Sequence, residues 1–175
     1  MLYLGTVTTK SLNYGDSTLS RLSARVGRIL LERKLTVTTA ESCTGGFIAK
    51  VLTDIAGSSA WFVEGFVVYS NSAKLNRLGV STATLHKHGA VSQAAARAMA
   101  IGALKRARTD LAVAVTGIAG PGGAVPGKPV GTVFIGWAVR RGRSIQILVV
   151  RKMFRGDRDT VRRKTVRAAL LGLTR

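Results

Sequence analysis

The chain has 175 residues, of which 46% are hydrophobic and 20% charged, a composition typical of one globular domain and not of a disordered segment. Its formal net charge of +19 predicts attraction to polyanions, but aromatic residues make up only 6% and are too sparse for a surface that stacks bases. No apolar run is long enough to cross a bilayer, the N-terminus does not resemble a signal peptide, and the single cysteine, Cys43, fits a cytoplasmic protein without disulfides.

The start of the chain divides into an extension and a first helix. Residues 1–15 show no hydrophobic periodicity and are predicted to be a ragged extension, so that the domain spans residues 16–175. Apolar residues then recur at helical spacing, with arginines on the other face. Asp16 or Ser17 is expected to cap this helix, which ends near Lys34.

The first turn that carries chemistry is ESCTGG, residues 41–46. It follows a β-branched run at residues 35–39, which predicts a strand, and it precedes an apolar helical run that ends at about residue 54. Strand, small-residue turn and helix together place backbone N–H groups where they can bind a phosphate or a forming oxyanion. Ser42 is then a candidate nucleophile, and the alternative is that Ser42 and Thr44 only cap the helix.

A second turn, YSNSAK at residues 69–74, offers a base. The apolar run before it, residues 65–68, predicts a buried strand. Ser70 or Asn71 is expected to cap the next helix, which puts Lys74 in its first turn. The helix dipole and burial would both disfavour a charge on this lysine, as a general base requires. The alternative is a solvated surface lysine.

The second half of the chain predicts three more helices, three strands and a glycine-rich loop. The last two strands are separated by only four residues, which predicts an antiparallel hairpin. In chain order the segments are a short helix and turn at 81–89, a helix at 93–106 capped by Ser92, a strand at 111–115, the loop TGIAGPGG at 116–123, strands at 130–139 and 144–153, and a last helix capped within 156–159.

This alternation of strands and helices predicts an α/β fold. We expect a three-layer α/β/α sandwich with a mixed, largely parallel central sheet ending in a hairpin. If the first three strands are parallel, the loops that hold Ser42, Tyr69 and Thr116 leave the same edge of the sheet. Open α/β sheets bind their ligands at that edge.

Three other features are set aside as functional sites. Residues 122–128, GGAVPGK, match most of a phosphate-binding loop, but Pro129 replaces the hydroxyl residue and a strand follows. His86 and His88 are two residues apart and do not share a helix face, so no metal site is expected. Cys43 has no histidine nearby in sequence, and a small buried filler is the favoured interpretation.

Three further residues stay open on this reasoning. Glu41 can orient a catalytic group, bind a substrate hydroxyl or pair with an arginine. Ser59 either caps the run that begins at Trp61 or relays a proton in the site. Tyr69 is more often an aromatic residue at a strand end than a catalyst, and its position beside the lysine turn keeps it a candidate.

Seven ordered motifs together resemble the C-terminal domain of the competence/damage-inducible protein CinA. The resemblance covers the chain from about Thr18 to the end, and the combination is far more specific than any one motif. The motifs are TAESCTGG (39–46), GSSA (57–60), YSNSAK (69–74), HGAVS (88–92), VTGIAGPGG (115–123), KPVGT (128–132) and GDR (156–158).

The resemblance implies an α/β amidohydrolase that needs neither a metal nor a cofactor and that assembles as a homo-oligomer. Its substrate would be nicotinamide mononucleotide, which water converts to nicotinic acid mononucleotide and ammonia. By the same resemblance Ser42 is the nucleophile, and Lys74 and Tyr69 activate it and pass the proton to the leaving ammonia. The other implied roles are Ser59 near the site, Thr116, Gly117 and Arg158 in substrate binding with Arg158 on the phosphate, and the backbone of Thr44, Gly45 and Gly46 as the oxyanion hole.

Two alternatives belong to other function classes. The first is a non-catalytic module for polyanions or DNA, linked to competence or damage response, and it rests on the net charge of +19. The second is hydrolysis of a different amide by the same Ser-Lys chemistry. Salt dependence of DNA binding distinguishes the first from the leading hypothesis, and a panel of amides distinguishes the second.

Overall fold

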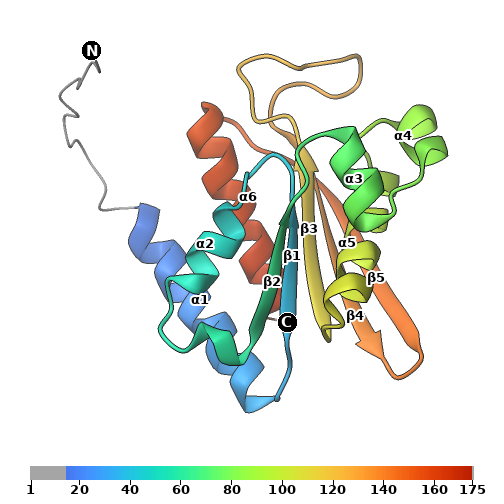
Figure 1. Ribbon diagram of the computed structural model, residues 1–175. Helices are drawn as coiled ribbons and strands as arrows, with labels where there is room; N and C mark the ends of the chain where they lie inside the picture. The colour runs from blue at the N-terminus through green and yellow to red at the C-terminus, as the bar shows by residue number, and fades with distance from the viewer. Residues whose placement is uncertain (1–14, 175) are drawn as a thin grey trace, which may run out of the picture.

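A five-stranded mixed sheet lies between two layers of helices in the computed structural model, which describes residues 15–174 (Figure 1). The predicted extension, residues 1–15, lies outside the described residues except for its last one. In chain order the elements are α1 (Gly15–Glu32), β1 (Val37–Glu41), α2 (Phe47–Thr53), the 3-10 turn η1 (Ser58–Ala60), β2 (Phe62–Val67), α3 (Asn71–Leu78), α4 (Thr82–His88), α5 (Gln93–Ala107), β3 (Leu111–Gly117), β4 (Thr132–Arg141), β5 (Ser144–Met153) and α6 (Arg158–Leu173).

The strand order is β2-β1-β3-β4-β5. Strand β1 pairs in parallel with both β2 and β3, whereas β4 is antiparallel to its neighbours β3 and β5. The predicted α/β class, the mixed sheet and the final hairpin are therefore confirmed. Because β1, β2 and β3 run in the same direction, the loops that follow them all leave one edge of the sheet, the edge formed by the carboxyl ends of these strands, as expected.

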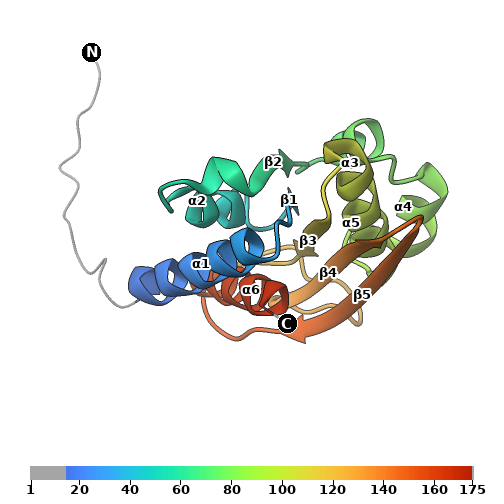
Figure 2. The same cartoon turned by 90° about the horizontal axis from the view of Figure 1, so that it is seen from below.

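Helices cover both faces of the sheet, which completes the three predicted layers (Figure 2). Helices α1, α2 and α6 pack on one face around a core that includes Val37, Trp61 and Val115. Helices α3 and α5 pack on the other face, and α4 contacts α5. Gly136 of β4 lets α5 lie close to the sheet, because a Cβ at this position would come to 3.0 Å from the Ala96 carbonyl oxygen. No described helix has the length and apolarity needed to cross a membrane.

Two local predictions at the start of the chain are wrong. Helix α1 is already formed at Gly15, so Asp16 and Ser17 lie within the helix and do not cap it. Strand β1 starts later than predicted, because Leu35 N–H donates to the Leu30 carbonyl and Thr36 N–H donates to an Asp110 carboxylate oxygen. These contacts hold residues 35 and 36 in the turn that follows α1, so the strand begins only at Val37.

The prediction of a buried strand at residues 65–68 is also wrong. Strand β2 is an edge strand that pairs only with β1, and within the predicted run Val67 is 53% exposed, whereas Val68, just after the strand, is buried. An apolar run reports the composition of a strand and not its place in the sheet. Of the three hydrophobic side chains in the run, Val67 is therefore exposed, Phe66 is half-buried and Val68 is buried.

Candidate active site

Ser42 lies at the first turn after the central strand β1. Its backbone N–H donates to the Val115 carbonyl of β3 (3.0 Å), and its own carbonyl accepts from the Gly45 N–H (3.1 Å). The side chain is 9% exposed. The sheet on one side and the turn on the other thus hold this serine at the edge where the parallel strands end.

Lys74 reaches the same point from α3. Ser70 caps this helix by accepting from the Ala73 N–H (3.0 Å), which confirms one of the two predicted caps. Lys74 is 1% exposed, so the alternative of a solvated lysine is wrong. Its Nζ lies 3.0 Å from Ser42 Oγ. The two side chains that the sequence analysis paired therefore meet in the interior.

Three oxygen atoms surround Lys74 Nζ. Besides Ser42 Oγ these are the carbonyl oxygens of Val68 (2.8 Å) and Tyr69 (3.1 Å). An ammonium can donate to all three, whereas a neutral amine donates to the two carbonyls and turns its lone pair to the serine hydroxyl. Burial lowers the pKa of Lys74 from its ordinary value. The lowered pKa shifts Lys74 towards the neutral form, which can accept a proton from Ser42.

Cys43 is not a second nucleophile. It is 6% exposed and belongs to the hydrophobic core on the α1–α2–α6 side. Burial is the main cause that raises the pKa of its thiol to about 12. Because the thiolate and not the thiol is nucleophilic, this cysteine is inert, and the prediction of a buried filler is confirmed.

Glu41 organises the turn instead of pairing with an arginine. It is fully buried, and its carboxylate accepts hydrogen bonds from the Thr44 hydroxyl (2.6 Å) and from the N–H groups of Ile48 (2.9 Å) and Ala49 (2.8 Å). The first N–H groups of α2 are consequently occupied. The expectation that the tip of this helix is open to a ligand is therefore wrong.

The proposed capping roles of Ser42 and Thr44 are not found either. The N-cap residue of α2 is Gly46, which has no side chain to cap with and adopts a left-handed conformation with φ of 93°. Of the backbone N–H groups expected to form an oxyanion hole, that of Gly45 donates to the Ser42 carbonyl. Those of Thr44 and Gly46 make no hydrogen bond to another described residue, and they remain the candidates.

Arg158 joins three segments beside the site. It is the first residue of α6, and its Nη1 donates to the Gly120 carbonyl (2.8 Å) in the β3–β4 loop. Its Nη2 donates to the Tyr69 hydroxyl (3.1 Å), and the Tyr69 side chain is 60% exposed. Tyr69 thus approaches Lys74 through its carbonyl, while its hydroxyl meets Arg158.

Thr116 and Gly117 lie at the expected edge but are engaged in the fold. Thr116 is 1% exposed and its hydroxyl donates to the Ala90 carbonyl (2.8 Å), which ties β3 to the loop before α5. A Cβ at Gly117 would lie 2.7 Å from the Thr132 carbonyl oxygen, so the close approach of β3 and β4 requires glycine. The Thr116 hydroxyl is thus directed to Ala90 and not towards a ligand, and Gly117 has no side chain to offer one.

Ser59 does not join this group within one chain. It lies in η1, which precedes β2, and it is exposed. Ser42 follows β1, whereas η1 precedes β2, and because these two strands are parallel the two serines lie at opposite edges of the sheet. The expectation from the resemblance is corrected here, because a matching motif does not fix on which side of its strand a residue lies.

The sequence analysis missed Arg162. Its Nη2 donates to the Thr44 carbonyl (2.6 Å), and its guanidinium lies 5.9 Å from the centre of the Phe47 ring. Arg162 Nε is buried without a hydrogen-bond partner among the described residues. The available signal was spacing, since Arg162 follows Arg158 by one helical turn and shares its face of α6.

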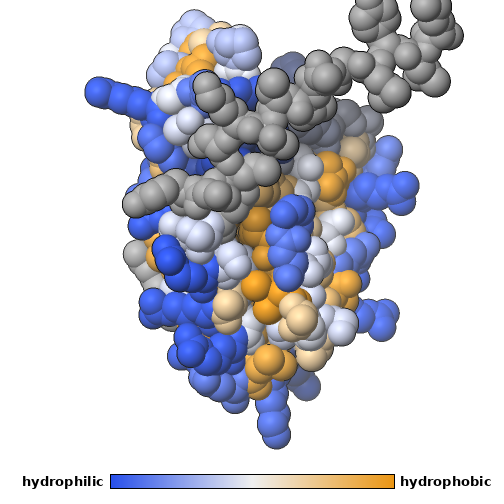
Figure 3. Space-filling model, turned by 90° about the vertical axis from the view of Figure 1, so that its left-hand side faces the viewer, coloured by the Kyte–Doolittle hydropathy of each residue, from blue (hydrophilic) through white to orange (hydrophobic). Residues whose placement is uncertain are grey.

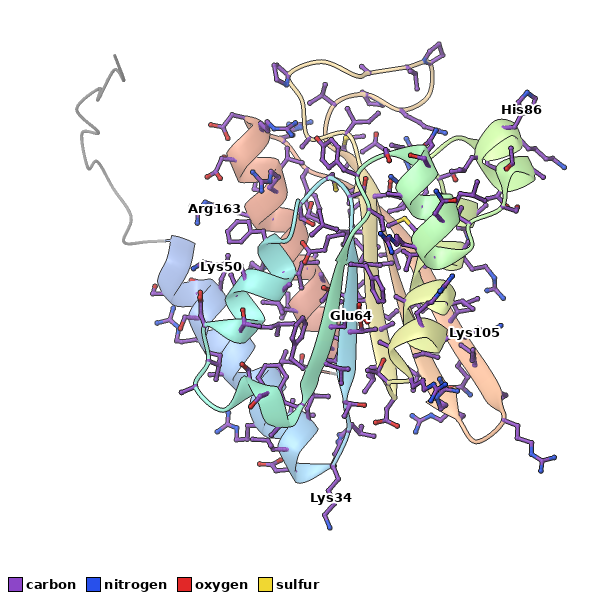
Figure 4. The ribbon with its side chains drawn as sticks, in the orientation of Figure 1. Lys34, Lys50, Glu64, His86, Lys105 and Arg163 are labelled. Carbon is purple, nitrogen blue, oxygen red and sulfur yellow. The ribbon has the colours of Figure 1, made fainter. Side chains whose placement is uncertain are left out.

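The two histidines lie outside the site. Both are exposed on α4, and Figure 4 shows the labelled His86 pointing away from the sheet. Within residues 15–174, no group of three or more His, Cys, Asp or Glu side chains is placed to hold a metal ion. The arrangement at the sheet edge is instead a hydroxyl, a buried amine and unpaired backbone donors, which suits nucleophilic attack on a carbonyl carbon.

Comparison with known families gives a match over nearly the whole described chain. The model of the CinA C-terminal domain matches residues 19–175. A nicotinamide-nucleotide amidohydrolase PncC from Escherichia coli strain K12 is 57% identical over 155 residues, which cover 89% of this chain and 92% of that protein. A CinA-like protein from Geobacter sulfurreducens is 52% identical over 161 residues, which cover 92% of this chain but 37% of that longer protein.

Solved structures agree with this match. A competence/damage-inducible protein from Agrobacterium tumefaciens superposes with a TM-score of 0.85 at 47% identity, covering 95% of this chain and 100% of that one. The competence damage-inducible protein A from Klebsiella pneumoniae gives a TM-score of 0.84 at 44% identity, covering 89% of this chain and 94% of that one. The fold and the sequence therefore point to the same group of proteins.

Proposed function

Because the chain belongs to the CinA C-terminal domain family, we propose that it is a nicotinamide-nucleotide amidohydrolase. It converts nicotinamide mononucleotide and water to nicotinic acid mononucleotide and ammonia. The name and the 57% identity of the Escherichia coli relative support this substrate. The observation that carries the chemistry is the buried pair of Ser42 Oγ and Lys74 Nζ, 3.0 Å apart.

In the first half of the reaction, Ser42 forms an ester with the substrate. The Lys74 amine accepts the hydroxyl proton as Ser42 Oγ attacks the carboxamide carbon. The C–N bond of the resulting tetrahedral intermediate then breaks, and the Lys74 ammonium gives its proton to the departing nitrogen, which leaves as ammonia. The carbonyls of Val68 and Tyr69 hold Nζ in place throughout, because they accept from the amine and from the ammonium alike.

In the second half, water releases the acid. Lys74 is again neutral and accepts a proton from a water molecule that attacks the ester carbon. The bond to Ser42 Oγ breaks, the serine recovers its proton, and nicotinic acid mononucleotide departs. Backbone N–H groups of Thr44 and Gly46 face the negative oxygen of both tetrahedral intermediates in this proposal, since neither has another partner in the described chain.

Substrate binding is assigned to the basic side chains that border the turn. Arg158 uses two of its five N–H groups on Gly120 and Tyr69, which leaves donors for the phosphate. Thr116 and Gly117 contribute by shaping the floor of the site. The homo-oligomer remains a prediction that sedimentation equilibrium tests. The domain boundary at residue 16 remains a prediction that limited proteolysis tests.

An ammonia-release assay with a substrate panel tests the proposed function. Nicotinamide mononucleotide should be hydrolysed, whereas nicotinamide without its ribose phosphate should be a poor substrate because nothing would engage the basic residues. Equal turnover of a range of unrelated primary amides would overturn the assignment of the nucleotide as substrate and favour a general amidase.

The positive charge supports a second candidate, a module that binds polyanions. The exposed basic residues include Arg151, Lys152, Arg155 and Arg167, on β5, on α6 and between them. Figure 3 shows hydrophilic side chains along much of the face formed by α1, α2 and α6, with apolar surface between them. DNA binding that persists at physiological salt would favour this function, and binding lost at modest salt would mark the attraction as non-specific.

A further inference from the structure

We propose that Glu41 is a positioning residue for this reaction: its buried carboxylate fixes the turn that presents Ser42 and the oxyanion donors. The inference rests on the proposed function, because it assigns a part of the same site. The sequence analysis left the role of Glu41 open among three possibilities, and its carboxylate makes no hydrogen bond to Ser42 or Lys74 in the structure.

The groups that surround the Glu41 carboxylate are hydrogen-bond donors, which match its acceptor oxygens. It is 0% exposed and receives three donors, the Thr44 hydroxyl and the N–H groups of Ile48 and Ala49. An ionised carboxylate has only acceptors, whereas a glutamine amide would turn an N–H group towards at least one of these donors. The substitution Glu41→Gln therefore preserves size but disrupts the contacts.

These contacts determine which way residue 44 faces. The Thr44 hydroxyl is held by Glu41 at 2.6 Å, and the Thr44 carbonyl is held by Arg162 Nη2 at 2.6 Å. The side chain and the carbonyl are thus fixed from two elements, α6 and the end of β1. Only the Thr44 N–H remains without a partner in the described chain, and it is the group that the mechanism directs to the oxyanion.

The fold also contains a matched control. Asp110 lies at the opposite edge of the sheet, before β3, and one of its carboxylate oxygens accepts from the Thr36 N–H and the Thr36 hydroxyl, both at 2.8 Å. It holds a chain segment beside the same strand with the same kinds of donors. Asp110→Asn therefore reproduces the loss of a structural carboxylate without touching the nucleophile turn.

The test is the rate at which a fluorophosphonate probe labels Ser42, followed by mass spectrometry. Ser42 Oγ displaces fluoride from the probe phosphorus, so the rate reports the position of the nucleophile and its oxyanion donors without any nucleotide substrate. We expect labelling of Glu41→Gln to be about 100-fold slower than that of the wild type, because misplacement by about 1 Å costs that much. Asp110→Asn should be labelled at the wild-type rate. Circular dichroism should show that both variants are folded.

Each outcome decides the inference. Equal labelling of folded Glu41→Gln and wild type, or equal slowing in Asp110→Asn, overturns the role of Glu41 while leaving the nucleophile in place. If the wild type is not labelled at Ser42, the proposed nucleophile fails and this inference fails with it. Should Glu41→Gln not fold, Thr44→Val removes only the hydroxyl donor: slower labelling supports the role of the carboxylate, and an unchanged rate overturns it.

Discussion

Lys74 Nζ lies 3.0 Å from Ser42 Oγ, although 32 residues separate the two along the chain. The contact exists because β1 and β2 are parallel neighbours that end at the same edge of the sheet. The turn after β1 carries the serine, and the helix after β2 carries the lysine. A change that shifts either strand by one residue would separate the hydroxyl from the amine.

Replacing the base should abolish most turnover. Lys74→Met keeps an apolar stem of similar length but removes the atom that accepts the serine proton. We expect kcat to fall by about 100-fold to 10,000-fold, the usual contribution of a general base. Ammonia release under substrate saturation measures kcat. If Lys74→Met keeps about a tenth or more of the wild-type kcat, Lys74 does not transfer the proton.

The lowered pKa of Lys74 should appear in the stability of the protein. Above that pKa the folded lysine is neutral, while the unfolded one stays protonated up to its ordinary value of 10.5. The unfolded state then binds more protons, so the free energy of unfolding should rise with pH in this window. Urea unfolding should be followed below pH 9, the ordinary value for the Cys43 thiol, whose raised pKa acts in the opposite direction above it. A flat profile, identical in Lys74→Met, would contradict the shift.

Tyr69→Phe should be a mild substitution. The hydroxyl accepts from Arg158 at an exposed position, and the contact to Lys74 uses the backbone carbonyl, which phenylalanine retains. We expect a loss of at most about tenfold in kcat/KM, seen mainly as a higher KM, because one exposed hydrogen bond is removed. A loss of kcat as large as that of Lys74→Met would show that the Tyr69 hydroxyl takes part in proton transfer.

Gly46→Ala should damage catalysis and stability together. Gly46 adopts φ of 93°, and an added Cβ would lie 3.3 Å from Val67 Cγ2. A left-handed conformation costs an alanine about 1–2 kcal/mol. Gly57→Ala is the control, since its φ is 79° and a Cβ added there would have no other atom within 4 Å.

The two alanine variants should lose similar stability in thermal unfolding, but only Gly46→Ala should lose kcat. The reason is that the proposed mechanism uses the Gly46 N–H as an oxyanion donor, whereas Gly57 lies near the opposite edge of the sheet. Equal kcat values for the two variants would show that the turn tolerates distortion and would weaken the assignment of Gly46 to the oxyanion hole.

The sequence predicted the elements and the contact between Ser42 and Lys74 well, because both depend on local signals. Ser70 and Ser92 cap their helices as expected, and the final hairpin follows from a four-residue link. The pairing of Ser42 with Lys74 required only that two parallel strands end at one edge. The residues that form turns and the direction of neighbouring strands can be predicted from a single sequence.

The errors concern properties that only the assembled fold determines. Nothing in the run at residues 65–68 distinguishes an edge strand from a central one, and β2 proved to be the edge. Glu41 could not be assigned before its three donors were placed, since two of them come from α2. Ser59 matched a motif but precedes its strand, so it lies far from Ser42.

The most direct measurement of the central claim compares ammonia release from nicotinamide mononucleotide by the wild type and by Ser42→Ala. The hydroxyl is the only group removed, and the alanine leaves the backbone contacts to Val115 and Gly45 intact. The account predicts steady turnover by the wild type and none above background by the variant, with unchanged unfolding. Turnover by Ser42→Ala at the wild-type rate would contradict it.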